Sequence, residues 1–422
     1  MSKGRLLVII VIILFISVFG YGIYFVATNT HFLNFNISDE DIDQNNLQVP
    51  KVDEEKYKFT SLVKKKLNVP DRFKDSVPAE KTLNIPEDFE ISVFYAGFGG
   101  IRHFDFDEDD NLIAADIKAG KVFMIKDFDK DGIGDESIII DESLRSIHSI
   151  EYFEGDLYSG EEDKIVVYKG LNELGEFREK KVLVSGLPTG GHRTRTVVIG
   201  PDRKMYVSVG SSCNVCLEEN ELRAAVLRYD LNGNFEKVFA KGLRNSVGMV
   251  FKGTDLWSVD NGRDRIGEDL PFEEVNVVRE DKHYGWPYCH SDQESNPEFP
   301  DRLNFCLKET VRPIYKMQAH SAPLDLKFGP TDISNNAFPG NLEETLFVSF
   351  HGSWNRTVPT GYKIVRIDTN TEDSSVINFI TGWLEEGGRV WGRPVGLGFD
   401  SNGRMFISDD HIGAIYIVRY LP

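Results

Sequence analysis

A recurring pattern of short apolar strands organises most of this chain. Six times, an alternating apolar segment is followed by an acidic or glycine-containing turn and then by a second apolar segment. The copies read FDFDEDDNLIAAD, IEYFEGDLYSG, VIGPDRKMYVSVG, MVFKGTDLWSVDNG, LDLKFGP with NLEETLFVSFHG, and LGFDSNGRMFISDD. Period-two alternation bounded by turn residues is typical of paired strands, and repetition at blade length is typical of a radial array. The pattern therefore predicts an all-β fold, a six-bladed β-propeller.

The segments between the copies complete the predicted blades. Further β-rich stretches such as KVFMIKDF and YKIVRIDT follow the copies and supply the outer strands. We expect the last strand, Ala414–Tyr420, to share a blade with the early strand Phe89–Tyr95, because this closes the ring and removes free sheet edges. The longest gap separates the fourth and fifth copies and holds Cys289 and Cys306, which predicts an insertion that overhangs one face.

A cationic or titratable residue comes shortly before each copy. In a propeller the first strand of each blade lines the central channel, and the loop that enters it opens on one rim. Residues at equivalent positions of all six loops therefore indicate a shared axial site, and their charge favours an anionic ligand. These residues are Arg102, His148, His192, Arg244, His320 and Arg393.

The N-terminus has the pattern of a membrane span. Lys3 and Arg5 precede an uncharged run from Leu6 to Ala27, and about 20 apolar residues suffice to cross a bilayer as a helix. The positive flank predicts a cytoplasmic N-terminus and an extracytoplasmic body. A cleaved signal peptide is the alternative, but the small-residue cleavage pattern is poor, which favours an uncleaved anchor. The predicted organisation is an anchor over 1–28, a polar linker over 29–82 and a catalytic propeller over 83–422.

Charge and cysteine content narrow the function. A net charge of -19 and a pI near 5.0 argue against a nucleic-acid partner, since phosphate binding needs a basic surface. In an oxidising compartment the natural disulfides are Cys213–Cys216 and Cys289–Cys306, with a redox-active CxxC as the alternative for the first pair. No cysteine and histidine spacing suits zinc, and Leu217 stands where haem attachment needs a histidine.

Several segments carry residues suited to catalysis. GGHRTRTVVIGPD holds His192 among glycines, which favours a general base open to a ligand, although a structural rim histidine is the alternative. Arg244 and Asn245 place a charge beside an amide, and the Gly262 carbonyl has acidic residues nearby and could face a cation. HGSWNRTVPTGY adds polar and aromatic residues on the same rim: His351, Trp354, Asn355 and Arg356.

The segment DFDKDGIGDE predicts a cation site in a hairpin. Oxygen-bearing side chains at alternate positions, with Gly132 for a sharp turn, suit a structural Ca²⁺ ion. Ile138 occupies the twelfth position, where an EF-hand has a glutamate, so a shorter loop is indicated. The alternative is a solvated acidic hairpin. The candidate ligands are Asp127, Asp129, Asp131 and Asp135.

Over about residues 83–422 the chain resembles the soluble quinoprotein sugar dehydrogenases, the glucose and sorbosone dehydrogenase-like family. The resemblance is carried by GGHRTRTVVIGPD, YVSVGSSCNVC, GLRNSVGMVF, DNGRDRIGEDLP, HYGWPYC, HGSWNR and GRPVGLGFD, the later ones being most similar to the sorbosone branch. It implies a six-bladed propeller that binds pyrroloquinoline quinone (PQQ) with Ca²⁺ at the axial mouth.

The resemblance also implies roles for individual residues. His192 matches the base that takes the hydroxyl proton as hydride moves to the quinone C5. Arg244 matches the arginine that polarises the C5 carbonyl, and Asn245 matches its neighbour on the cofactor. The remaining correspondences are Gly262 and Arg263, whose main-chain carbonyls would hold Ca²⁺, Arg393 on a PQQ carboxylate, and Arg356 or His351 in place of a lysine.

Three positions depart from the pattern of the glucose enzymes. Gly191 replaces the acidic residue before the catalytic histidine, Trp391 stands where a second carboxylate-binding arginine is expected, and Arg263 replaces a proline. These departures weaken the case for glucose as the substrate more than the case for the cofactor.

The leading hypothesis is a membrane-anchored dehydrogenase, dependent on PQQ and Ca²⁺, that oxidises an aldose or a related sugar. Electrons would pass to a quinone or a redox protein, and the cofactor would carry the redox chemistry. Arg102, His148 and His320 are further cofactor-binding candidates on the rim. The alternatives are a calcium-dependent propeller lactonase or hydrolase and a non-catalytic sugar-binding propeller on the cell surface.

Overall fold

The computed structural model describes residues 61–421, apart from 331–337, 339–341 and 371–373. The predicted membrane anchor at 1–28 and the linker as far as residue 60 lie outside the described residues. Within the described part of the chain, no helix combines the length and the apolar character needed to span a bilayer.

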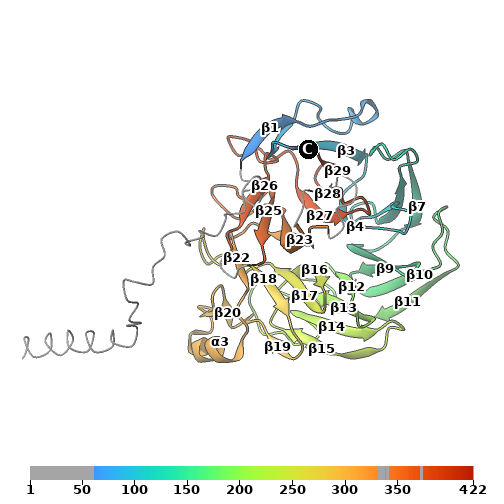
Figure 1. Cartoon of the computed structure of the whole chain (residues 1–422). Helices are drawn as coiled ribbons and strands as arrows, with labels where there is room; N and C mark the ends of the chain where they lie inside the picture. Colours follow the sequence, from blue (N-terminus) through green and yellow to red (C-terminus); the bar gives the residue numbers. More distant parts are fainter. Residues whose placement is uncertain (1–60, 331–337, 339–341, 371–373, 422) are drawn as a thin grey trace, which may run out of the picture. The chain divides into compact units, whose positions relative to one another are not determined.

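Six antiparallel blades form the body of the molecule (Figure 1), which confirms the predicted all-β six-bladed propeller. Each blade is built on four antiparallel strands, and the sheet of the third blade gains a fifth strand, β19, from the insertion. The innermost strands of the six blades are β4, β8, β12, β16, β23 and β27. The first three blades are β4 (Ile101–Phe106), β5 (Leu112–Asp116), β6 (Lys121–Lys126) and β7 (Glu136–Glu142); β8 (Ser149–Phe153), β9 (Asp156–Glu161), β10 (Lys164–Lys169) and β11 (Glu179–Ser185); and β12 (Val197–Ile199), β13 (Lys204–Val209), β14 (Ala225–Asp230) and β15 (Phe235–Lys241).

The other three blades follow the same order along the chain, and the last of them takes its outer strand from the N-terminal side. They are β16 (Ser246–Lys252), β17 (Asp255–Asp260), β18 (Glu273–Val278) and β22 (Tyr315–Met317); β23 (Pro323–Phe328), β24 (Thr345–Phe350), β25 (Lys363–Asp368) and β26 (Ile377–Ile380); and β27 (Pro394–Phe399), β28 (Met405–Asp409), β29 (Ala414–Tyr420) and β3 (Phe89–Ala96).

The ring is closed. Inner strands contact one another in the cyclic order β4, β8, β12, β16, β23, β27 and back to β4. The last strand, β29, pairs antiparallel with β3 from Ala414 opposite Ala96 to Tyr420 opposite Phe89, so the predicted closure by the two chain ends is confirmed. Apolar side chains between adjacent sheets form the core, as the alternation predicted.

Residues before the propeller are more structured than the sequence suggested. β1 (Leu62–Lys66) and β2 (Thr82–Pro86) form a hairpin, with the short 3₁₀ turn η2 (Asp71–Phe73) between them. Leu67, Val69, Phe73 and Val77 are buried in the same core cluster as β3. The expected linker therefore does not extend to residue 82, because apolar residues of this segment pack against the closing blade.

Carboxylates on inner strands bind the backbone of the next blade. The innermost strand of a blade is a sheet edge with unpaired N–H groups, which cost free energy when they are buried without a partner. Three backbone N–H groups of this edge are bonded by carboxylates from the preceding blade. The bonds are Tyr152 N to Asp105 Oδ2 at 2.7 Å, Ile199 N to Glu151 Oε1 at 3.1 Å and Leu397 N to Asp325 Oδ2 at 2.8 Å.

Both predicted disulfides are present, Cys213–Cys216 and Cys289–Cys306. The second one lies in the predicted insertion of the fourth blade, between β18 and β22. This insertion contains β19 (Lys282–His283), β20 (Cys289–His290), β21 (Glu294–Ser295), η3 (Pro300–Arg302) and α3 (Leu303–Glu309), and β19 pairs in parallel with β15 of the third blade. The 3₁₀ turn η4 (Leu342–Glu344) precedes β24.

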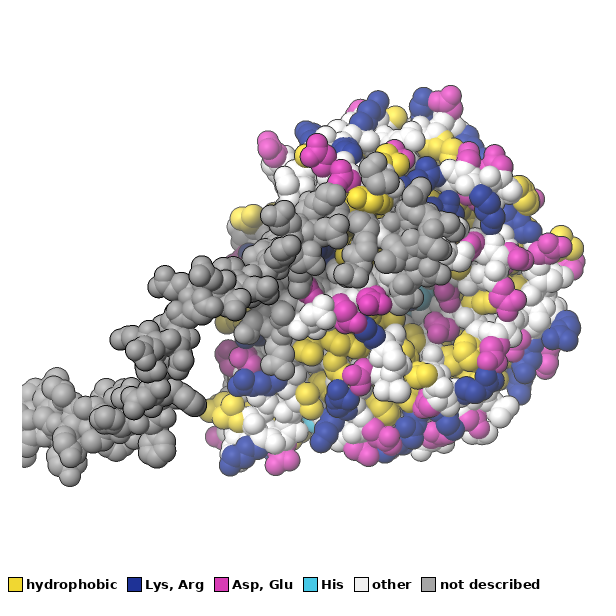
Figure 2. Space-filling view, in the orientation of Figure 1, with side chains coloured by type: hydrophobic (Ala, Val, Ile, Leu, Met, Phe, Trp, Pro, Cys, Tyr) yellow, Lys and Arg dark blue, Asp and Glu magenta, His cyan; other side chains and the backbone are white. Residues whose placement is uncertain are grey.

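Acidic and basic side chains are interspersed over the face seen in Figure 2. No broad basic field covers the described part of this face.

Candidate active site

A cavity of about 550 Å³ opens between the loops of the third, fourth and fifth blades. Its walls come from the loops that enter β12, β16 and β23 and from those that follow β17 and β24. All of these loops lie at one rim, because strands alternate in direction within each blade. The lining residues are His192, Arg244, Asn245, Asn261, Gly262, Asp264, Glu273, His320, Ala322, Trp354 and Asn355.

His192 is held in one tautomer by Ser211. Its Nδ1 lies 3.0 Å from the Ser211 carbonyl oxygen and 3.0 Å from the Ser211 hydroxyl. A carbonyl only accepts hydrogen bonds, and the hydroxyl already donates to the Cys213 carbonyl at 2.7 Å. Nδ1 therefore carries the hydrogen, and Nε2 carries the lone pair. Burial, reinforced by the positive charge of Arg244, lowers the pKa of His192 to about 4, so the ring is a neutral base at pH 7.

Gly191 explains the missing acidic residue before His192. Its φ is +62°, and a Cβ at this position would lie 2.5 Å from the Ser211 carbonyl oxygen. No side chain fits at residue 191 between the loop that enters β12 and the loop that follows β13. The Ser211 carbonyl and hydroxyl therefore orient the imidazole in this chain.

His320 shares the cavity but has no free ring nitrogen. Its Nε2 donates to the carbonyl oxygens of Gly267 at 2.8 Å and Leu270 at 3.0 Å, and its Nδ1 accepts from the Asn355 amide at 3.3 Å. His320 therefore positions Asn355 and the loop after β17. Of the two histidines that line the cavity, only His192 presents a lone pair.

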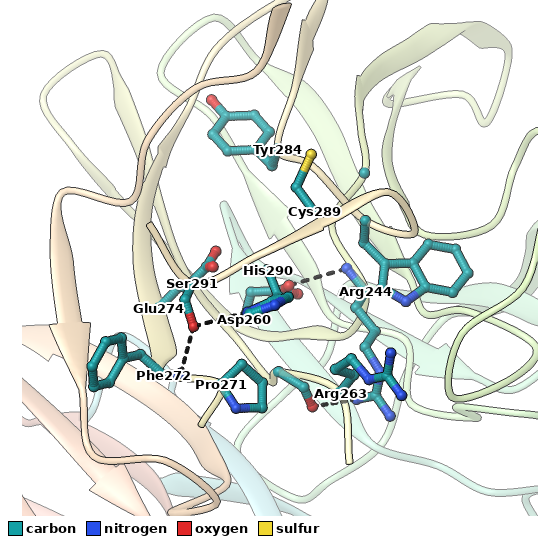
Figure 3. A pocket seen from close by; sticks show the side chains of 13 residues that line it. Arg244, Asp260, Arg263, Pro271, Phe272, Glu274, Tyr284, Cys289, His290 and Ser291 are labelled. Carbon is teal, nitrogen blue, oxygen red and sulfur yellow. Dashed lines mark hydrogen bonds between the residues drawn. The ribbon is translucent and has the colours of Figure 1, made fainter. Parts of the chain in front are cut away.

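Arg244 ties two loops together beside His192. Its guanidinium donates to the carbonyl oxygens of Asn214 at 3.1 Å, Asn261 at 3.1 Å and Gly262 at 2.8 Å, and it lies 3.4 Å from the Asp264 carboxylate. Arg244 also lines a smaller pocket, together with residues of the insertion such as Cys289 and His290, and Figure 3 shows that pocket. These bonds hold the charge of Arg244 at a defined place in the cavity.

Two buried carboxylates fix the backbone around Arg244. Asp260 accepts from the backbone N–H groups of Arg244 at 3.0 Å and Asn245 at 2.8 Å, and Glu273 accepts from the Gly262 N–H at 2.7 Å. Burial raises the pKa of Asp260 to about 6 and that of Glu273 to about 8. The motif analysis missed both residues. Each of them is an acidic residue at one end of a strand, at a position where the alternation predicts a side chain that faces the interior. This feature of the sequence could have identified them.

The remaining rim cations form a second group around Asp410. Arg102 Nε lies 3.0 Å from Asp410 Oδ2, and His351 Nε2 lies 2.8 Å from Asp410 Oδ1. Arg393 donates to the carbonyl oxygens of His351 at 3.2 Å and Gly352 at 2.9 Å. Within the described residues no carboxylate forms an ion pair with Arg393, so its charge stays available to an anionic ligand.

Besides the group around Asp410, the predicted residues His148, Arg356 and Arg263 lie outside the cavity wall, and so does Trp391, which stands where an arginine was expected. His148 is 2% exposed, and its pKa is lowered well below the usual value by burial and by Arg102, so it is a buried neutral residue. Arg356 is bound to the Glu268 carbonyl and to Asp269 at 2.9 Å. The side chain of Arg263 bonds Glu298 at 2.5 Å under the insertion. Trp391 is 6% exposed and donates to the Gly382 carbonyl at 2.6 Å, so it is a core residue.

Oxygen donors for a cation line the same cavity. The Gly262 carbonyl, predicted as a ligand, accepts from Arg244 and has a second lone pair, and the carboxylates of Asp264 and Glu273 are close by in the wall. This donor set is of the kind that Ca²⁺ prefers. The hairpin aspartates lie apart from the cavity, in the loop between β6 and β7.

Comparison with known proteins supports the motif resemblance. The model of a family described as TrAA12-like matches residues 83–421. A protein of Borreliella burgdorferi, described only as uncharacterized, is 32% identical over 301 residues, covering 67% of this chain and 77% of that protein. A PQQ-dependent pyranose dehydrogenase of Coprinopsis cinerea is 26% identical over 316 residues, covering 57% of this chain but only 41% of the fungal protein's length.

Solved structures show the same fold. The holo form of the pyranose dehydrogenase PQQ domain from Coprinopsis cinerea matches with a TM-score of 0.70 at 20% identity, over 84% of this chain and 100% of that one. The iodide structure of the Trichoderma reesei family AA12 protein matches with a TM-score of 0.68 at 23% identity, over 80% of this chain and 97% of that one. Since the family model spans the whole propeller, the chain belongs to the TrAA12-like family.

Proposed function

We propose that this chain is a PQQ-dependent dehydrogenase that oxidises a sugar, with His192 as the general base. The observation that carries the proposal is a neutral histidine of fixed tautomer beside a fixed arginine in one cavity. The matched relatives that are named for PQQ-dependent sugar oxidation support it. We extend the substrate to an aldose or a related sugar of the pyranose or sorbosone type.

The cavity has the chemistry that PQQ requires. PQQ is a planar tricarboxylate, and Trp354, 70% exposed, offers an aromatic face at the cavity wall. Arg244 would hold carboxylate or carbonyl oxygens, with Asn245 and Asn355 as amide donors. Arg393, which lies outside the cavity lining in the second group of rim residues, would hold a carboxylate of the cofactor. When bound, PQQ would supply the two-electron acceptor, which no amino-acid side chain provides.

His192 and Arg244 would divide the work on the substrate. The Nε2 lone pair of His192 would take the proton from a sugar hydroxyl, while Nδ1–H stays bonded to Ser211 and keeps the ring aligned. Arg244 would stabilise negative charge that develops beside it. Glu273 and Asp260 would keep Gly262 and Arg244 in place through their bonds to backbone N–H groups.

A calcium ion fits the carbonyl side of the cavity. Gly262 and Arg263 would contribute main-chain oxygens, and Asp264 would add a carboxylate. A calcium-containing structure of the Trichoderma reesei family AA12 protein supports a calcium-dependent fold of this kind.

Reconstitution tests the proposal. The purified chain, supplied with PQQ and Ca²⁺, should reduce an artificial electron acceptor in the presence of some members of a panel of aldoses, and neither addition alone should suffice. Absence of PQQ binding at micromolar cofactor, followed by spectral titration, would overturn it. A hydrolysed lactone without PQQ would instead favour the propeller lactonase.

The fall of kcat/KM at low pH should reflect protonation of His192. Its pKa lies near 4, below the ordinary 6.5, so protonation should remove the base only as the pH falls through about 4. We expect kcat/KM to decline with a midpoint near pH 4, measured from pH 3 to 8 with short assays. A midpoint near 6.5 would contradict the buried, neutral histidine.

Stability must be followed across the same range. The pKa of His351 is also lowered to about 4 by burial, and the unfolded chain would bind these protons near pH 6.5. The unfolded state therefore gains protons first, and the free energy of unfolding should fall as the pH drops from about 6.5 to about 4. A circular-dichroism melt at each pH separates this loss from the titration of the base.

The membrane anchor at 1–28 and an extracytoplasmic catalytic domain remain part of the proposal. The uncharged run from Leu6 to Ala27 supports them. If the full chain is released from membranes by alkaline carbonate, the anchor is refuted.

A further inference from the structure

We propose that the loop between β6 and β7 binds a calcium ion of its own, and that this ion stabilises the contact between the first blade and the blade that closes the propeller. The loop spans residues 127–135 in the first blade and lies apart from the catalytic cavity. The proposal does not depend on PQQ or on the proposed dehydrogenase activity.

Three carboxylates converge in this loop. Asp127, Asp129 and Asp135 each place an oxygen within 4.8 Å of the other two. Oxygens bound to one Ca²⁺ ion at about 2.4 Å lie at most about 4.8 Å apart, and these three carboxylates meet that condition. Asp131, the fourth predicted ligand, is not in this cluster, since its carboxylate accepts the Ile133 N–H at 2.7 Å.

A buried oxygen in the cluster has no partner. Asp127 is only 7% exposed; its Oδ2 accepts the Gly132 N–H at 2.8 Å, but its Oδ1 is buried and accepts no hydrogen bond from any described residue. A buried carboxylate oxygen without a partner is costly.

Other hairpins of the same chain satisfy an equivalent aspartate completely. In the loop between β4 and β5, Asp107 Oδ1 accepts two backbone N–H groups and Oδ2 accepts the Asn111 amide at 2.8 Å. In the loop between β14 and β15, Asp230 is bonded in the same way by Asn234, with an Oδ2 bond of 2.8 Å. The β6–β7 loop has Asp131 where those two loops have Asn111 and Asn234, and the second oxygen of Asp127 is left without a donor.

The lysines nearest in sequence are directed elsewhere. Lys130 donates to the Asp109 carbonyl at 2.9 Å in the neighbouring hairpin, and Lys126 lies 5.8 Å from the Phe128 ring. Arg72 approaches Asp135 only to 3.9 Å. The three converging carboxylates are therefore not neutralised by close ion pairs, and a hard divalent cation suits them.

The same loop touches the strands that close the ring. Its Gly134 N–H donates to the Phe94 carbonyl of β3 at 2.9 Å, and Arg419 of β29 donates to the Asp131 carbonyl. β3 and β29 are the two strands that join the chain ends. An ion that rigidifies the loop would therefore stabilise the contact between the first blade and the closing blade.

Calcium binding to the PQQ-free chain tests the inference. Asp127→Asn keeps an oxygen for the Gly132 N–H and removes the charge, and Asp129→Asn changes an exposed side chain that folding does not need. We expect titration calorimetry to give one Ca²⁺ fewer per chain for each variant than for the unaltered chain. Asp230→Asn, the matched control in a satisfied hairpin, should bind as many ions as the unaltered chain.

Thermal unfolding provides the second measurement. Saturating Ca²⁺ should raise Tm by about 4 °C more in the unaltered chain and in Asp230→Asn than in Asp129→Asn. Equal stoichiometry and equal Tm shifts in all chains would overturn the proposal. Dehydrogenase activity after reconstitution is measured separately, so its failure would count against the proposed function and not against this site.

Discussion

Replacing His192 with alanine is expected to lower kcat of the reconstituted enzyme by about 10²–10⁴-fold, the range that loss of a general base produces. The physical reason is that His192 is the cavity histidine whose Nε2 lone pair is free, since Nδ1–H is bonded to Ser211. Because the proposed role is proton removal, the substrate KM and the affinity for PQQ should change by much less. Steady-state kinetics over the active sugar, with PQQ titration by absorbance, measure both.

Two companion variants make this result specific. His192→Gln should also lose activity, because an amide can keep the bond to Ser211 but cannot accept a proton at neutral pH. His411→Gln alters an exposed histidine outside the cavity and should leave kcat unchanged. Full activity of His192→Gln would refute the base assignment, and since both nitrogens of His320 are bonded, a different mechanism would be required.

Removal of Arg244 should have a comparable effect, on both activity and stability. Arg244→Ala deletes the group that bonds the carbonyl oxygens of Asn214, Asn261 and Gly262, and leaves the Asp264 carboxylate without its ion-pair partner. We expect kcat to fall about 10²–10³-fold from the lost electrostatic stabilisation. The free energy of unfolding should fall by about 3 kcal/mol, because buried acceptors and a charge are left unpaired.

Arg244→Lys separates charge from geometry. A lysine restores the positive charge, but it lacks the planar guanidinium group that donates to several carbonyl oxygens at once. Arg244→Lys should therefore recover part of the activity and little of the stability. The matched control is Arg203→Ala, which breaks an exposed ion pair with Glu154 and should change stability much less than Arg244→Ala does. Urea unfolding of the three variants supplies the comparison, and an Arg244→Ala chain as stable as the control would contradict the structural role.

The propeller was predictable because its signal is local and repeated. Each blade carries its own alternation and turn, as in the segments from Met249 and from Leu397, so no single ambiguous strand decided the fold. The closure of the ring by β3 and β29 followed from the general need to remove free sheet edges. Both disulfides followed from the small number of cysteines.

Only some of the predicted rim residues lie together in one site. His192, Arg244 and His320 do meet in one cavity, but Arg102 and His351 are joined through Asp410, a residue that no motif singled out. Partners such as Asp410 come from another blade, and their sequence position carries no sign of the contact. His148 shows the same limit: its equivalent position predicted a rim residue, yet burial leaves it neutral and enclosed.

The sequence by itself determined the blade count, the closing strands, the disulfides and the candidate residues for the site, because these depend on local periodicity and on residue type. Only the tertiary structure decided their states. It showed that Ser211 sets the His192 tautomer, that Gly191 leaves no room for an acidic side chain, and that Glu273 holds the Gly262 backbone. A pKa, a tautomer or a free oxygen such as Asp127 Oδ1 depends on burial and on groups distant in sequence, and those distances exist only in the folded chain.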